Sequence, residues 1–130
     1  MTGFATLSND DWCKAITPQG YVEGPCMLKR KGVYYFMWSE GNWTDGTYHV
    51  SYSSGQSPID ICPAGKTILQ SSDIAEGPGH HGYLNIPGTD DWLIVYHRRI
   101  IGDREPGHRV LCMDKLEFDG NAILPVTMTK

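Results

Sequence analysis

The sequence predicts an all-β protein made of repeated antiparallel sheets. Apolar runs rich in Tyr, Val, Ile, Trp and Phe alternate with clusters of turn residues, and helical periodicity is scarce. The stretch Val22–Pro25 recurs as Ala75–Pro78, so that Glu76 follows Glu23 by 53 residues. A period near fifty residues, built of short strands, is typical of propeller blades or a related array.

The chain is too short to close a propeller ring. Its 130 residues hold about 2.5 such units, whereas closed propellers have about four to eight four-stranded blades. We therefore predict a single incomplete propeller domain with antiparallel, four-stranded blades. Residues 1–20 are expected to form a leading partial blade, residues 21–72 a complete blade, and residues 73–130 a second blade with a closing strand.

Each expected strand is an apolar run between two turns. The runs lie at residues 33–38, 47–52, 83–86, 92–96, 109–113, 116–118 and 123–126. The first of them is apolar on both faces, as expected of a strand between neighbouring sheets. In the second run, Tyr48, Val50 and Tyr52 share one face. Asp119–Asn121 is expected to be the tight turn of the last hairpin.

Composition excludes several classes of partner. The net charge of −4 gives no reason to expect nucleic acid or an anionic membrane. The longest apolar runs are too short to span a bilayer. The first residues lack both a basic region and an apolar core, so we expect no secretory signal and a cytoplasmic location.

Glu23 is the first candidate for chemistry. It precedes Gly-Pro at the start of a strand, and in a propeller such strand ends open onto the central channel. A partly desolvated carboxyl there has a raised pKa, which a proton donor to a glycosidic oxygen needs. The alternative is architectural: the residue caps a turn, and its repetition as Glu76 reflects a shared structural role.

Two further groups of side chains fall near strand ends. His80 and His81 lie between glycines and either contact a metal or ligand or form a hydrogen-bonded pair in a turn. Trp43 is a candidate for stacking on a sugar ring, although buried Trp is commoner. Arg109 is a candidate for holding hydroxyl or carboxylate groups, with ion pairing to a nearby carboxylate such as Asp114 as the alternative.

Taken together, these motifs resemble the C-terminal half of the catalytic domain of glycoside hydrolase family 43. The matching segments follow the family's order: residues 22–25, 29–39, 46–50, 77–81, 91–99 and 108–114. The resemblance implies a five-bladed β-propeller and an inverting mechanism, with Glu23 as the general acid. It implies calcium near His80, with His81 as the alternative, and a sugar contact by Arg109. Trp43 and His81 are further candidates for substrate contact, and xylo- or arabino-oligosaccharides are the expected ligands.

The family's general base is an Asp of the first blade, and a second Asp in the second blade orients the acid; neither blade is present. Asp10 and Asp11 lie too close to Glu23 in the chain to replace the base. We therefore expect no glycosidase activity from the chain alone. It is either a carbohydrate-binding or vestigial module that self-associates and is inactive alone, or an active, inverting β-xylosidase or α-arabinofuranosidase once another chain supplies the complementary half. Two copies forming a dimer are one way to cover the open side.

Overall fold

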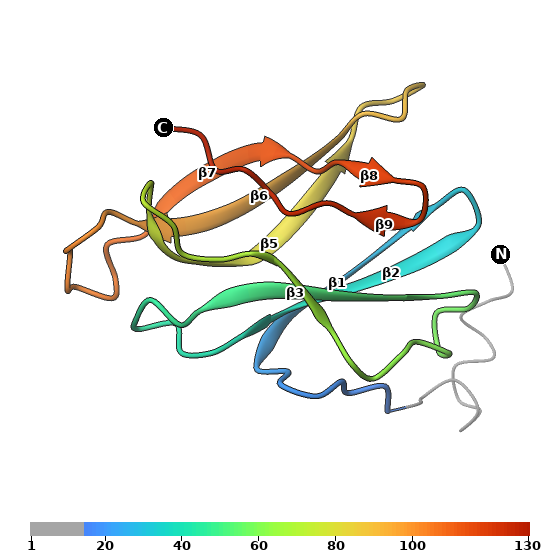
Figure 1. Ribbon diagram of the computed structural model, residues 1–130, viewed down its shortest axis with the longest axis horizontal. Helices are drawn as coiled ribbons and strands as arrows, with labels where there is room; N and C mark the ends of the chain where they lie inside the picture. Colours follow the sequence, from blue (N-terminus) through green and yellow to red (C-terminus); the bar gives the residue numbers. More distant parts are fainter. Residues whose placement is uncertain (1–14) are drawn as a thin grey trace, which may run out of the picture.

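The computed structural model describes residues 15–130, all of them in strands, turns and connecting segments (Figure 1). The all-β class predicted from the sequence is therefore confirmed. The expected leading segment at residues 1–20 lies largely outside the described residues. No helix in residues 15–130 is long and apolar enough to cross a membrane.

The first sheet has four antiparallel strands in chain order. They are β1 (Glu23–Arg30), β2 (Val33–Glu40), β3 (His49–Gly55) and β4 (Lys66–Leu69). Lys31 and Gly32 both have positive φ values, 48° and 81°, as a two-residue hairpin turn between β1 and β2 requires. The central strand β2 is buried along nearly its whole length, in agreement with its apolar character on both faces.

The second sheet has three antiparallel strands in the described part of the chain. They are β5 (Glu76–Asn85), β6 (Trp92–Arg99) and β7 (Val110–Lys115). The expectation of four strands per blade therefore holds for the first sheet and is wrong for the second. Leu116, directly after β7, still pairs with the second sheet, because its amide donates to the carbonyl of Trp92 at 3.0 Å. The chain then leaves this sheet instead of returning alongside β7.

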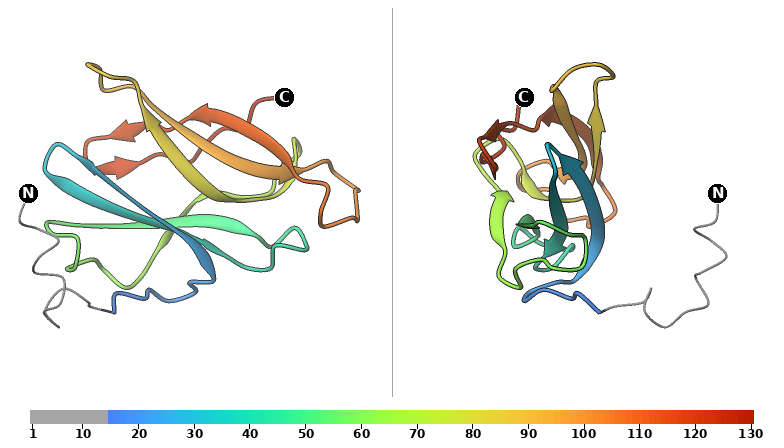
Figure 2. Two further views of the ribbon diagram at one scale, coloured as in Figure 1. Left: turned by 180° about the vertical axis from the view of Figure 1, so that it is seen from behind. Right: turned by 90° about the vertical axis from the view of Figure 1, so that its right-hand side faces the viewer.

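The C-terminal segment closes the outer edge between the two sheets (Figures 1 and 2). The last hairpin is shorter than expected, with β8 (Phe118–Asp119) and β9 (Ala122–Ile123) only two residues each. The turn falls at Gly120 and Asn121, because Gly120 takes the positive φ of 58° that the turn needs. Beyond it, the amide of Val126 donates to the carbonyl of Ile68 at 2.7 Å, which ties the segment to β4.

The main core lies between the two sheets. Its buried members are Leu28, Val33, Tyr35, Met37, Val50, Tyr52, Ile68, Leu69, Ala75, Ile94, Tyr96, Leu116, Ile123 and Met128. On β2 and β6 they alternate with residues of the opposite face, as the period of a strand dictates. The second sheet thus packs one face onto the first, in the manner of neighbouring propeller blades.

The opposite face of the first sheet is covered by the chain itself. Phe36 and Trp38 point to that side and are 6% and 0% exposed. The segment between β3 and β4 lies over them: a Cβ added to Gly65 would collide with the Trp38 ring. The hydroxyl of Ser53 donates to the carbonyl of Cys62 at 2.7 Å, which holds this segment in place.

Candidate active site

The carboxyl of Glu23 lies at one end of the first sheet. Glu23 begins β1 and is paired with Ser39 near the end of β2. Its side chain is 40% exposed, so a ligand in solution can reach it. The hydroxyl of Tyr48, just before β3, donates a hydrogen bond of 2.8 Å to Oε1 of Glu23. This bond orients the carboxyl group and leaves part of it free.

Tyr48 is a rigid support for that bond because its side chain is fully buried. Its ring packs against the backbone of Gly79 on β5, where a Cβ would collide with it. The ring also stacks on His97 of β6, with centroids 5.8 Å apart and planes 8° from parallel. Burial is the main cause, and the neighbouring Glu23 carboxylate a smaller one, of a Tyr48 pKa that is raised to about 12. The phenol therefore keeps its proton, and remains a donor, at neutral pH.

His80 reaches the same site from the second sheet. It lies within the irregular pairing of β5 and has a positive φ of 48°. Its amide donates to Oγ of Ser39 at 2.8 Å, and its Nδ1 lies 3.9 Å from Oε1 of Glu23. Gly24 allows this approach, because a Cβ there would lie 3.3 Å from the Cα of His80. The bulge thus brings His80 to the carboxyl group of the neighbouring sheet.

Trp43 and Arg109 lie next to each other at the end of the molecule that carries Glu23. Trp43 lies in the β2–β3 loop and is 42% exposed, and Cζ of Arg109 lies 5.4 Å from its ring centroid. Arg99 of β6 anchors this loop by donating from Nη1 to the carbonyl of Thr44 at 2.9 Å. Burial first, and the charge of Arg109 second, lower the pKa of His97 to about 4. The positive charge of Arg109 therefore acts on the His97 ring, which stacks on Tyr48 beside Glu23.

His81 is separated from this group although it follows His80 directly. Its side chain is only 6% exposed, and neither ring nitrogen has a hydrogen-bond partner within residues 15–130. Burial, together with the charge of His80, lowers its pKa to about 4, so the ring is neutral at pH 7. The expected substrate contact by His81 stays a prediction, and this burial gives a surface ligand no direct access to the ring.

The residues present do not by themselves make a calcium site. Calcium takes about six to eight oxygen ligands in proteins. Residues 15–130 contain no group of three or more His, Cys, Asp or Glu side chains placed to hold a metal. Calcium at His80 therefore stays a prediction.

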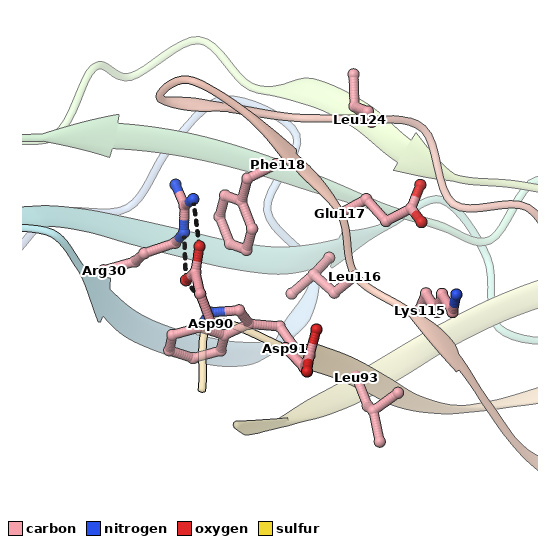
Figure 3. A pocket seen from close by; sticks show the side chains of 10 residues that line it. Arg30, Asp90, Asp91, Leu93, Lys115, Leu116, Glu117, Phe118 and Leu124 are labelled. Atoms are coloured by element: carbon pink, nitrogen blue, oxygen red, sulfur yellow. Dashed lines mark hydrogen bonds and ion pairs between the residues drawn. The ribbon is translucent and has the colours of Figure 1, made fainter. Parts of the chain in front are cut away.

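A separate hollow of about 380 Å³ lies at the opposite end of β1 (Figure 3). There Arg30 forms a two-bond ion pair with Asp90 of the β5–β6 turn, at 2.9 and 2.7 Å. Its Nη1 donates to the carbonyl of Gly120 at 2.9 Å, and its guanidinium lies 4.2 Å from the Phe118 ring centroid. Arg30 and Asp90 are already paired with each other, so they are not free to bind a ligand. The Arg30–Asp90 pair instead acts as a clamp that holds the two sheets together.

Sequence reasoning missed the residues that support Glu23. Tyr48 was placed on a shared face with Val50, but no spacing in the sequence connects its hydroxyl with a carboxyl 25 residues earlier. Ser39 lies in the matching segment 29–39, but nothing in the sequence indicates that its hydroxyl accepts from the amide of His80. His97 belongs to a basic run near a strand end, yet its stacking on Tyr48 depends on how the two sheets pack.

The fold and this site define part of a propeller in which an exposed carboxyl group is oriented at one end of the first sheet. The sequence profile of glycosyl hydrolases family 43 matches residues 3–123. The chain therefore belongs to this family. It is similar to the β-D-galactofuranosidase xynD of Aspergillus niger, with 46% identity over 116 residues; these are 88% of this chain and 34% of that enzyme.

Solved structures show the same fold. A thermostable family-43 glycoside hydrolase superposes with a TM-score of 0.68 and 26% identity, covering 82% of this chain and 35% of the other. The α-L-arabinanase of Cellvibrio cellulosa, solved with arabinohexaose, gives a TM-score of 0.69 at 20% identity, covering 81% and 36%. These enzymes are five-bladed propellers, so the chain is a partial propeller. It spans about a third of the length of the relatives it matches.

Proposed function

We propose that this chain supplies the acid side of a glycosidase site, with Glu23 donating a proton to the glycosidic oxygen of the leaving group. The observation that carries the proposal is the hydrogen bond of 2.8 Å from the buried Tyr48 hydroxyl, which orients an exposed carboxyl. Trp43 and Arg109 offer an aromatic face and a guanidinium at the same end. Such faces stack on sugar rings, and guanidinium groups bind hydroxyl groups.

Turnover needs a second carboxylate. An inverting glycosidase pairs its acid with a base about 6.5–9.5 Å away, so that a water fits between the base and the sugar. Among residues 15–130, the side chains recorded in contact with the Glu23 carboxyl are Tyr48 and His80. We therefore propose that the chain alone binds carbohydrate without hydrolysing it, and that a complementary polypeptide supplies the base.

The proposed ligands are oligosaccharides of five-membered-ring sugars. The Aspergillus relative is named as a β-D-galactofuranosidase, and the Cellvibrio arabinanase was solved with arabinohexaose. β-D-Galactofuranose and the α-L-arabinofuranose of arabinan share their ring stereochemistry and differ in the exocyclic carbon chain. Arabino-oligosaccharides are therefore the first choice. Xylo-oligosaccharides, whose xylose rings are six-membered, are the alternative outside this class.

Titration calorimetry with arabino-, xylo- and galactofuranosyl oligosaccharides tests the binding proposal. We expect binding that weakens at least tenfold in Trp43→Ala, because the stacking surface is lost. Tyr83→Ala removes another exposed aromatic side chain, 39% exposed on β5, and should leave affinity unchanged. Binding that is absent for all three sugars, or that is equal in both variants, would contradict the proposal.

A further inference from the structure

We infer that Arg99 and Ser71 are positioning residues for carbohydrate binding, because they fix the loop that carries the aromatic face of Trp43. We call residues 41–48, between β2 and β3, the Trp43 loop. The inference rests on the carbohydrate binding proposed above. Both residues act through the loop and not on the ligand itself.

The Trp43 loop has no strand structure and is stabilised by bonds within itself. The amide of Thr44 donates to Oδ1 of Asn42 at 2.9 Å, and the amide of Thr47 donates to Oδ1 of Asp45 at 2.8 Å. Such bonds fix the shape of a turn, but they do not fix its place relative to the two sheets. Since Trp43 itself is 42% exposed, burial of its ring does not fix that place either.

Arg99 provides the first contact from outside the loop. Its side chain is 3% exposed, and its Nη1 donates to the carbonyl of Thr44 at 2.9 Å. Gly77 on β5 makes room for this contact. A Cβ there would lie 2.8 Å from the carbonyl oxygen of Asp45 and 3.0 Å from Nη2 of Arg99. The loop and the guanidinium therefore meet over a position that only a glycine allows.

Ser71 provides the second contact, from the connection between β4 and β5. Its hydroxyl donates to the carbonyl of Gly46 at 2.7 Å and accepts from the amide of Gly77 at 2.9 Å. The bond from Gly77 directs the hydroxyl hydrogen towards the loop. Two carbonyls that closely follow Trp43 in the chain are thus held from outside. The turn cannot swing without breaking one of these bonds.

Arg99 also lies between the Trp43 loop and the β6–β7 loop, residues 100–109. Hydrogen bonds within the Trp43 loop are the main cause, and the charge of Arg99 a smaller one, of the lowered pKa of Asp45. The pKa of Asp103 in the β6–β7 loop is lowered in the same way. Each loop carries one member of the Trp43–Arg109 pair, in which Cζ lies 5.4 Å from the ring centroid. Arg99 is therefore placed to hold the two members together.

Stability alone does not explain a guanidinium at this position. Nε of Arg99 is buried and has no hydrogen-bond partner within residues 15–130. A buried donor without an acceptor costs free energy. An apolar side chain would avoid that cost, but it could not donate to the carbonyl of Thr44.

Two pairs of variants test the inference. Ser71→Ala removes one bond to the Trp43 loop. Ser72→Ala is its control, because the Ser72 hydroxyl accepts from the amide of Ile74 at 3.0 Å. Arg99→Ala removes the other bond. Arg98→Ala is its control, because Nη1 of Arg98 donates to the Tyr96 hydroxyl at 3.4 Å. Thermal unfolding identifies the variants that fold, and the serine pair decides the test if Arg99→Ala does not.

Fluorine NMR follows the place of the Trp43 ring without any ligand. The full chain is labelled with fluorotryptophan, and Trp43→Phe identifies the signal of Trp43. We expect this signal to shift or broaden in Ser71→Ala and Arg99→Ala and to stay in place in both controls. A role in stability alone would not move it in a chain that remains folded.

Titration calorimetry with arabino-oligosaccharides measures the consequence for binding. We expect affinity to weaken by about fivefold or more in Ser71→Ala and Arg99→Ala, because a mobile loop must be ordered when the ligand binds. The two controls should bind as the unchanged chain does.

A Trp43 signal that stays in place in the folded variants would overturn the inference. So would a signal that moves without loss of affinity, or an affinity that falls equally in variants and controls. No binding of any sugar by the unchanged chain is a different result. It would overturn the proposed function, and the role of the two residues in sugar binding with it.

Discussion

At the residue scale, Tyr48 and Gly79 form the contact on which the geometry of Glu23 depends. The Tyr48 ring occupies the space that a Cβ on Gly79 would need. We expect Gly79→Ala to lower the free energy of unfolding by about 2 kcal/mol or more, because a forced shift in a packed interior is costly. Gly82→Ala, on the same strand and in open space, should cost less than about 1 kcal/mol. Urea unfolding measures both, and equal losses would show that Tyr48 is not tightly held.

The hydrogen bond between Tyr48 and Glu23 leads to a prediction about the pKa of Tyr48. Burial is the main cause of the raised Tyr48 pKa, and the Glu23 carboxylate adds to it. Glu23→Gln removes the negative charge, so the pKa of Tyr48 should fall from about 12 while remaining above its ordinary value. NMR of Tyr labelled at Cζ follows this titration, with Tyr48→Phe giving the assignment. Glu76→Gln, at the equivalent position of the second sheet, should leave the Tyr48 titration unchanged.

At the element scale, the Arg30–Asp90 pair connects the β1–β2 hairpin with the β5–β6 turn (Figure 3). Arg30 is 9% exposed, so the loss of its partner leaves a largely buried charge without its acceptor. We expect Asp90→Ala to cost about 1–3 kcal/mol, the usual cost of leaving a buried hydrogen-bonding group without its partner. Asp91→Ala is the control, since no ion pair is recorded for this neighbouring side chain in residues 15–130. Thermal unfolding that is equal in the two variants would contradict the clamp.

The elements that the sequence predicted best are those that local pattern determines. The runs around Val33 and Trp92 became β2 and β6 because apolar residues and turn glycines act within a few positions. The path of the chain after β7 depends instead on contacts with residues far away in the sequence, such as the hydrogen bond from the amide of Val126 to the carbonyl of Ile68. That is why the strand expected at residues 123–126 is only two residues long.

The candidate site divides in the same way. The sequence pattern placed Glu23, His80 and Arg109 near strand ends, and in the structure these three residues lie at the same end of the molecule. The irregular pairing of β5 could not be read from the pattern, and it separates His80 from His81 by turning one outward and burying the other. The role of Tyr48 depends on the packing between sheets.

At the scale of the whole molecule, buried neutral histidines make stability depend on pH. Burial lowers the pKa of His81 from 6.5 to about 4. At pH 7 both the folded and unfolded states hold a neutral ring. Below about pH 6.5 the unfolded chain takes up a proton that the folded chain does not, so stability falls as pH falls towards 4.

For His81 alone, the loss between pH 7 and pH 5 should be about 2 kcal/mol. Urea unfolding at the two pH values gives the loss directly. In His81→Asn the loss should be smaller by about that amount, whatever the stability of the variant at pH 7. An unchanged dependence on pH would show that this ring is not the titrating group.

The central claim is that Glu23 is the acid of a site completed by another part of the propeller. The most direct measurement is hydrolysis of nitrophenyl α-L-arabinofuranoside and nitrophenyl β-D-galactofuranoside. Three samples are compared: the chain alone, the complex of the chain co-expressed with the unmatched remainder of the Aspergillus enzyme, and the same complex carrying Glu23→Gln. We predict turnover by the complex, none by the chain alone, and a loss of about 100-fold or more in kcat with Glu23→Gln. Hydrolysis by the chain alone, no hydrolysis by an assembled complex, or an undiminished kcat in the variant complex would contradict the account.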